Sequence, residues 1–370
     1  MEEPHSPHNN ITPELPIDII NSEILPRLPA KSAVGFKCVC QQWLSFLSTQ
    51  EFATMHYCRA AASRKLLYVD KRSPSIRTID CESPNHGSTT INHIPFEARP
   101  SDVVVLASLD GLVCLCLKKT CELVIWNPLT RAYKKLPNSK SQGFFKVDYD
   151  TVGFYVDSSN DYKILHIKLR RGTIGAYIYS RRLDTWRNIK FLKKRQRIYN
   201  YKWSSVIFSG DSLYFTVEEW CWGGETMVIG FDVNSEKFKE IRYPDVPRVD
   251  GDSFYANLVD VQNGLHMFAS YGFLDWTIDL WRMEEEKWVK VAAFTGIENM
   301  QFSMTPIYVM RNGKWLVTSD WSTIVYEIDI KEKDYICIDT KTNDYMCVHP
   351  GSWSPGIRVT YIESIVSPNL

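Results

Sequence analysis

The sequence contains no long hydrophobic run. No stretch approaches the roughly 18 apolar residues that a membrane-spanning helix needs. The first residues, MEEPHSPHNNITPELP, are polar and proline-containing where a secretory signal would have a basic start and an apolar core. We therefore expect a protein of the cytoplasm, the nucleus or both, with no membrane partner.

The sequence also has no excess of charge of either sign. Lys plus Arg and Asp plus Glu both total 43, so no electrostatic argument favours a nucleic acid as partner. The ten cysteines include no C-x-x-C pair, and no His or carboxylate cluster joins Cys38 and Cys40 or Cys114 and Cys116 at ligand spacing. We expect reduced, mostly buried thiols and no metal site.

Motifs of enzymatic chemistry are missing as well. The sequence has no G-x-S-x-G, no P-loop, no H-E-x-x-H and no Gly-rich dinucleotide fingerprint, and its eight histidines are scattered. We expect no catalytic residue and no cofactor. Sequence spacing leaves one alternative open, a metal site assembled from several separate segments.

The chain has two parts, which differ in pattern before and after about residue 60. In the first part, Pro16 precedes IDIINSEIL. Its spacing predicts an amphipathic helix with one apolar face formed by Ile19, Ile20, Ile24 and Leu25. Pro29 is a good first residue for a second helix, which carries Val34 and, after a bend, Trp43. About 40 residues are too few to bury a good core alone, so this helical part needs a partner surface.

These residues resemble the F-box of plant F-box proteins. The resemblance rests on Leu15-Pro16-x-Asp18, Ile24-Leu25-x-Arg27-Leu28-Pro29-x-Lys31-Ser32, Phe36-Lys37-Cys38-Val39-Cys40-x-x-Trp43, Phe52 and His56. It implies docking on a Skp-type adaptor, and through it on the cullin of a ubiquitin ligase. The residues implied to contact the adaptor are Leu15, Pro16, Ile19, Ile20, Ile24, Leu25, Leu28, Pro29, Val34, Val39 and Trp43.

Two departures from the usual F-box pattern stand out. Gly35 occupies a position where this family commonly has a basic residue, and glycine costs a helix roughly 1 kcal/mol relative to alanine. The segment between Asp18 and Ile24 is also one residue longer than in many relatives. The alternative is a helical cap that covers the following domain and binds no adaptor.

After residue 60 the sequence repeats itself. A large apolar residue is followed seven positions later by an aromatic residue in five segments, which begin at Trp126, Tyr179, Phe231, Trp281 and Ile328. Their intervals are 47 to 53 residues. Most copies come after a strand that begins with a glycine-containing turn. This pattern predicts four short strands in each repeat unit. The second aromatics, Tyr133, Trp186, Phe238, Trp288 and Tyr335, are expected to pack between units.

A repeat of about 50 residues that contains four strands is typical of a kelch-like β-propeller. IRTID around Ile76 predicts a degenerate first blade. The final strands, including residues 357–365, are expected to complete or latch a blade. We expect a small all-α N-terminal F-box followed by an all-β propeller with six blades, or alternatively seven. The expected boundaries are a disordered tail over 1–13, the F-box over 14–57 and the propeller over 62–370.

The second part resembles the F-box-associated domain of the same family. The resemblance rests on Asp110-Gly111, Trp126-Asn127-Pro128-Leu129-Thr130-Arg131, Leu136-Pro137 and Gly153-Phe154. A propeller presents loops on two faces, and Trp and Arg are frequent in binding hot spots. The candidates for binding a target protein are Trp203, Trp220, Trp222, Trp276, Trp353, Arg195 and Arg197. The basic string around Arg195 could also be a nuclear import signal or a solvated loop.

The resemblance thus implies a non-catalytic substrate receptor of an SCF-type cullin-RING ubiquitin ligase. Its F-box would bind the Skp-type adaptor, and its propeller would bind a target protein that the sequence does not identify. Two alternatives stay open at this point. One is an interaction scaffold that binds the adaptor without degradation of a target, and the other is a propeller enzyme with a metal site.

Overall fold

The structure is a computed structural model of the 370-residue chain. It describes residues 15–59, 64–70, 75–91, 94–138, 150–170, 173–192, 201–204, 206–219, 226–246, 253–272, 277–295, 304–319, 325–329, 334–338 and 359–369. The tail expected to be disordered, residues 1–13, lies outside these ranges.

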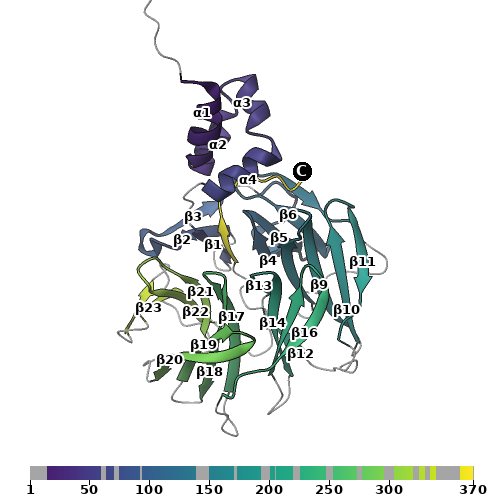
Figure 1. The fold of residues 1–370 in the computed structure, drawn as a ribbon, viewed down its shortest axis with the longest axis vertical. Coiled ribbons are helices and arrows are strands. Elements are labelled where there is room, and N and C mark those ends of the chain that lie inside the picture. Colours follow the sequence, from purple (N-terminus) through teal and green to yellow (C-terminus); the bar gives the residue numbers. More distant parts are fainter. Residues whose placement is uncertain are drawn as a thin grey trace, which may run out of the picture.

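The N-terminal part is helical, as predicted. Its elements are α1 (Ile17–Ile19), the π-helical turn η1 (Ile20–Ile24), the 3₁₀ turn η2 (Leu25–Arg27), α2 (Ala30–Phe36), α3 (Gln41–Phe46) and α4 (Gln50–Arg59). We call residues 15–59 the helical unit. Figure 1 shows α1, α2 and α3 projecting away from the strands, while α4 lies directly on them.

The remainder is a β-propeller of six blades, which confirms the lower of the two predicted blade counts. Blade 1 pairs β1 (Arg64–Asp70), β2 (Ser75–Asp80) and β3 (Ser88–Ile91) with β25 (Val359–Ile362). Blade 2 is β4 (Val103–Leu109), β5 (Leu112–Leu117), β6 (Glu122–Trp126) and β7 (Tyr133–Lys135). Blade 3 is β8 (Asp150–Val156), β9 (Tyr162–Arg170), β10 (Thr173–Ser180) and β11 (Thr185–Ile189).

Blade 4 has β12 (Tyr201–Trp203), the short β13 (Ile207–Ser209), β14 (Ser212–Glu219), β15 (Thr226–Asp232) and β16 (Lys237–Ile241). Blade 5 is β17 (Ser253–Val261), β18 (Gly264–Gly272), β19 (Thr277–Glu284) and β20 (Lys287–Thr295). Blade 6 is β21 (Met304–Val309), β22 (Trp315–Ser319), β23 (Val325–Asp329) and β24 (Asp334–Ile338). The 3₁₀ turns η3 (Pro84–His86) and η4 (Pro100–Asp102) flank β3 and β4.

The ring closes through its C-terminal strand. Strand β25 pairs with β1 over Arg64 to Leu67, so residues near both ends of the propeller share blade 1. Ser108 of blade 2 donates a hydrogen bond of 2.5 Å to the Thr360 carbonyl, which ties β25 to the next blade. The final strands were expected to complete or latch a blade, and the structure shows that β25 completes blade 1.

The seven-residue spacing in the sequence has a direct structural meaning. Trp126 and Tyr133 face each other as a cross-strand pair of β6 and β7, and the corresponding residues pair in blades 3, 4 and 6. Blade 5 differs, because Trp288 pairs with Met283 rather than with Trp281. Glu285 and Glu286 both have positive φ and make a tight two-residue turn, which shifts the register.

Six hydrophobic clusters fill the spaces between consecutive blades around the ring. The repeated aromatics pack into these clusters, as expected, at Tyr133, Trp186, Phe238 and Trp288. The side chain of Tyr335 lies outside the described residues. The cluster between blades 2 and 3 also contains the core of the helical unit, so the two parts share one hydrophobic interior.

Candidate functional site on the helical unit

The helical unit carries most of the exposed apolar side chains. Of nine large hydrophobic residues that are exposed among the described residues, six lie in this unit: Leu15, Ile17, Ile19, Ile24, Val39 and Leu44. We call these six the docking surface. The other three, Leu183, Val289 and Val291, lie on the much larger propeller. Because six exposed apolar side chains belong to so small a unit, it is the candidate site for a protein partner.

The eleven residues implied to contact an adaptor differ in how far they are exposed. Six are exposed: Leu15, Pro16, Ile19, Ile24, Pro29 and Val39. Four are half-buried and pack against the shared cluster: Ile20, Leu28, Val34 and Trp43. Leu25 is only 1% exposed and belongs to the interior. Ile17 and Leu44 were missed, although their apolar character beside Pro16 and Trp43 was a usable signal.

A π-helical turn explains why the first helix is not one continuous amphipathic helix. At its end the Leu25 N–H donates to the Ile20 carbonyl, a five-residue step instead of the usual four. Such a turn accommodates one additional residue in a helix. The sequence predicted one face for Ile19, Ile20, Ile24 and Leu25, but the structure leaves Ile24 exposed and buries Leu25.

The inner side of the helical unit is a small, well-packed core. Leu25, Ala33, Leu47 and Phe52 are at most 1% exposed. His56 of α4 is fully buried, and its Nε2 lies 2.8 Å from the Leu28 carbonyl oxygen. Burial lowers the pKa of His56, and the Leu28 carbonyl only partly opposes this effect. The imidazole is therefore held neutral and links α4 to the segment before α2.

The turn between α2 and α3 presents Val39, which at 60% is among the most exposed apolar residues of the docking surface. Cys40 caps α3, because its Sγ accepts the Trp43 N–H at 3.5 Å. Phe36 and Trp43 make an edge-to-face contact with ring centroids 5.5 Å apart. Gly35 near the end of α2 is exposed, and a Cβ there would have no atom within 4 Å. The Cys40 cap and the contact between Phe36 and Trp43 thus fix the backbone on both sides of Val39. At Gly35, by contrast, there is room for a larger side chain.

Of the candidates for target binding, the structure describes Trp203. Its ring is half-buried between blades 3 and 4 and packs on Phe215 and Phe191, at centroid distances of 5.7 and 6.3 Å. The other candidates lie outside the described residues: Trp220, Trp222, Trp276, Trp353, Arg195 and Arg197. The turn at Asp110, between β4 and β5, contacts α4. The ends of β14 and β18, which precede the segments that carry Trp220 and Trp276, lie at the opposite end of their blades from the turns equivalent to the one at Asp110.

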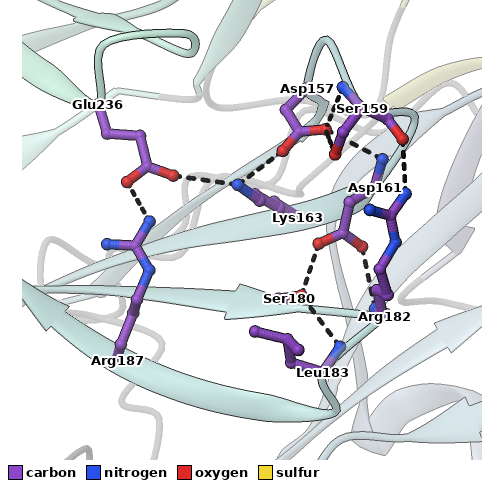
Figure 2. A network of polar contacts seen from close by, with 9 residues as sticks. All are labelled: Asp157, Ser159, Asp161, Lys163, Ser180, Arg182, Leu183, Arg187 and Glu236. Atoms are coloured by element: carbon purple, nitrogen blue, oxygen red, sulfur yellow. Dashed lines mark hydrogen bonds and ion pairs between the residues drawn. The ribbon is translucent and has the colours of Figure 1, made fainter.

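A polar network joins blades 3 and 4 at their turns (Figure 2). Lys163 lies between Asp157 and Glu236, at 2.7 and 3.1 Å, and Arg187 also pairs with Glu236. Burial alone would raise the pKa of Asp157, but hydrogen bonds from Lys163 and Ser159 hold it well below its usual range. Because the charges are paired with one another, we interpret this network as a connection between blades rather than a binding site.

Neither a metal centre nor a reactive pair stands out in the described part of the chain. Within the residues that the structure describes, no group of three or more His, Cys, Asp or Glu side chains could hold a metal ion. His166 and Asp150 lie 2.9 Å apart, but both side chains are fully buried, so a substrate has no access to them. The seven cysteines whose side chains the structure describes are free, and burial raises the pKa of Cys81 and Cys116 to about 12. In the same part of the chain, no helix is long and apolar enough to span a bilayer.

Comparison with known proteins gives consistent matches. Residues 51–368 match the sequence model of the F-box associated beta propeller domain, a span that includes α4 except its first residue and nearly all of the C-terminal segment after β25. An F-box/kelch-repeat protein of Arabidopsis thaliana is 26% identical over 308 residues, which cover 79% of this chain and 81% of that protein.

An F-box protein of the same plant is 22% identical over 287 residues, covering 72% of this chain and 75% of the relative. Among solved structures, TolB from Acinetobacter baumannii aligns with a TM-score of 0.47 at 8% identity, over 75% of this chain and 63% of TolB. That similarity is too low to bear on function.

Proposed function

This chain belongs to the family of proteins with an F-box associated β-propeller domain, and we propose that it is a substrate-recognition subunit of an SCF-type cullin-RING ubiquitin ligase. In this proposal the helical unit binds a Skp-type adaptor, and the propeller binds a target protein. The complex would act in the cytoplasm, the nucleus or both.

The docking surface is the observation that carries the proposal. Six large apolar side chains are exposed on the helical unit, although the unit has its own core and shares a cluster with the propeller. Covering such side chains stabilises a complex by roughly 25 cal/mol for each Å² of apolar area removed from water. A helical cap without a partner would gain nothing by leaving these residues in solvent.

The chain's part in ubiquitin transfer would be to bring two proteins together. A target held near a charged conjugating enzyme experiences a raised effective concentration, and no residue of the receptor needs to react. The strand ends that flank the candidate target-binding segments lie away from α4, which supports a target site separated from the adaptor. No cofactor is required for this role.

The proposal can be tested with two matched valines. Val39, 60% exposed in the helical unit, and Val291, 51% exposed on β20, should both tolerate aspartate without unfolding. Val39→Asp places a charge in the docking surface, so we expect its Kd for a purified Skp-type adaptor to rise at least about tenfold. Val291→Asp should bind the adaptor like the wild type.

Isothermal titration calorimetry with the full chain measures both dissociation constants. A wild type that does not bind the adaptor would contradict the proposal. Equal dissociation constants for the wild type and both variants would show that the adaptor binds outside the docking surface.

A further inference from the structure

The last residues of the chain lie between the helical unit and the propeller. After β25, the chain runs beside α4, where the C-terminus is found (Figure 1). Ile365 and Val366 are 4% and 1% exposed, in the cluster that joins the core of the helical unit to blades 2 and 3. We call residues 364–369 the C-terminal latch.

Asn127 holds the backbone of the C-terminal latch. Its Nδ2 donates to the carbonyls of Ser364 and Val366, at 2.9 and 2.7 Å. Its Oδ1 accepts the N–H groups of Leu129 and Thr130 within the turn between β6 and β7. Asn127 is fully buried, so these four hydrogen bonds form away from water.

Two further contacts fix the latch on blades 2 and 3. The Ser364 hydroxyl donates to the Asp110 carbonyl at 2.5 Å, and a Cβ on the next residue, Gly111, would overlap Ser364. Arg181 of blade 3 donates to the Ser367 carbonyl at 3.3 Å while its guanidinium lies over the Tyr162 ring. The fit of the latch therefore depends on the turns of two blades.

The side chain of Asp110 connects the same turn to the helical unit. It accepts hydrogen bonds from Tyr57 of α4 and from Tyr162 of blade 3, the latter at 2.8 Å. Asp110 adopts a left-handed conformation, with φ of 50°. One turn of blade 2 thus contacts α4 through its side chain and the latch through its backbone.

We propose that the C-terminal latch fixes the orientation of the helical unit on the propeller, with Asn127 as the positioning residue. The inference rests on the proposed function, because a fixed orientation sets the distance between an adaptor on the helices and a target on the propeller. The chain joins α4 to β1 covalently through residues 60–63, and the latch adds to the non-covalent contacts of the helical unit with the propeller, which include the hydrogen bond from Tyr57 to Asp110. When the distance between the adaptor and the target is fixed, the effective concentration of the target near the rest of the ligase stays constant.

Asn127→Asp tests the latch with almost no change in volume. The carboxylate keeps acceptors for the Leu129 and Thr130 N–H groups, but it loses both donors and faces the Ser364 and Val366 carbonyls. Asn312→Asp is the matched control, because Asn312 accepts the Lys314 N–H in an exposed turn of blade 6, whereas the latch lies on blades 2 and 3. A chain ending at Glu363 is the second variant, since it removes the latch and keeps β25.

Hydrogen exchange of the full chain and small-angle X-ray scattering of its complex with a purified Skp-type adaptor give the readouts. We expect α4 amides to exchange about tenfold faster in Asn127→Asp and in the truncated chain than in the wild type, with the strands of blades 4 and 5 unchanged. The scattering curves should indicate a larger radius of gyration for the complexes of both variants. Asn312→Asp should match the wild type in both measurements.

Adaptor capture separates this inference from the proposed function. If every chain binds the adaptor and α4 exchanges at the wild-type rate without Asn127 or the latch, the latch proposal is overturned. Loss of protection throughout the propeller in Asn127→Asp also overturns it, because the effect would then not be confined to the helices. If the wild type fails to bind the adaptor, the proposed function fails, while the exchange result still decides whether the latch holds α4.

Discussion

Among single residues, His56 makes the helical unit sensitive to pH. Its ring is fully buried and contacts the Leu28 carbonyl, and burial lowers its pKa. The unfolded chain, with an ordinary histidine pKa near 6.5, therefore binds a proton more readily than the folded chain as the pH falls. The contribution of neutral His56 to the stability of the folded chain is therefore complete above about pH 6.5, and it is lost as the pH falls through the pKa that His56 has in the folded state.

We expect the thermal midpoint of the helical unit to fall by a few degrees between pH 7 and pH 5. His56→Gln removes the titrating group, so it should flatten this dependence even if it lowers stability at every pH. His86→Gln is the control, because His86 is exposed in η3. Circular dichroism of the helices measures the midpoints, and equal slopes for the wild type and His56→Gln would contradict this account.

The sequence could not show which apolar residues of the first helix are buried. Ile24 and Leu25 are adjacent and equally apolar, yet one is 41% and the other 1% exposed. Neighbouring residues of a helix point roughly 100° apart, and the π-helical turn at Ile20–Ile24 changes which of the two faces the core. The additional residue between Asp18 and Ile24 was visible in the sequence, but the kind of turn that accommodates it was not.

At the scale of elements, α2 is the helix that substitution can improve. Gly35 is exposed within α2, and a Cβ there would meet nothing within 4 Å. Gly35→Ala should raise the free energy of unfolding by roughly 1 kcal/mol through helix propensity alone. Gly35→Arg should give a gain of roughly 0.8 kcal/mol and, in addition, restore the basic residue common in this family, so we expect tighter adaptor binding.

Chemical denaturation measures the first effect, and titration with the purified adaptor measures the second. The alanine variant separates them, because it raises helix propensity without adding charge. Equal adaptor affinities for Gly35→Ala and Gly35→Arg would mean that the charge at this position has no role in docking.

The repeat aromatics show what a sequence pattern can establish about elements. The seven-residue spacing predicted the cross-strand pairs of blades 2, 3, 4 and 6, because strand, turn and strand have nearly the same length in each. It was wrong for blade 5, where the turn at Glu285 and Glu286 is shorter and Trp288 pairs with Met283. Spacing fixes a register only while the turn length stays constant.

At the scale of the whole molecule, the six-bladed ring and the preceding helices were predictable, but the joint between them was not. The period near 50 residues is a local property, repeated along the chain. Asn127 and Ser364 are separated by 237 positions, and a single asparagine in a turn gives no sign of such a distant partner. Likewise, the sequence predicted only that residues 357–365 complete or latch a blade, while in the structure Ile365 and Val366 cover the helical core.

In our proposal, the helical unit docks on a Skp-type adaptor through its exposed apolar residues. The most direct measurement is hydrogen exchange of the full chain with and without the purified adaptor. We predict slower exchange on adaptor binding in the segments that carry Leu15 to Ile24 and Val39 to Leu44, with no change in the outer strands of blades 4 and 5. Binding that leaves these two segments unprotected, or that protects only propeller strands, would contradict the account.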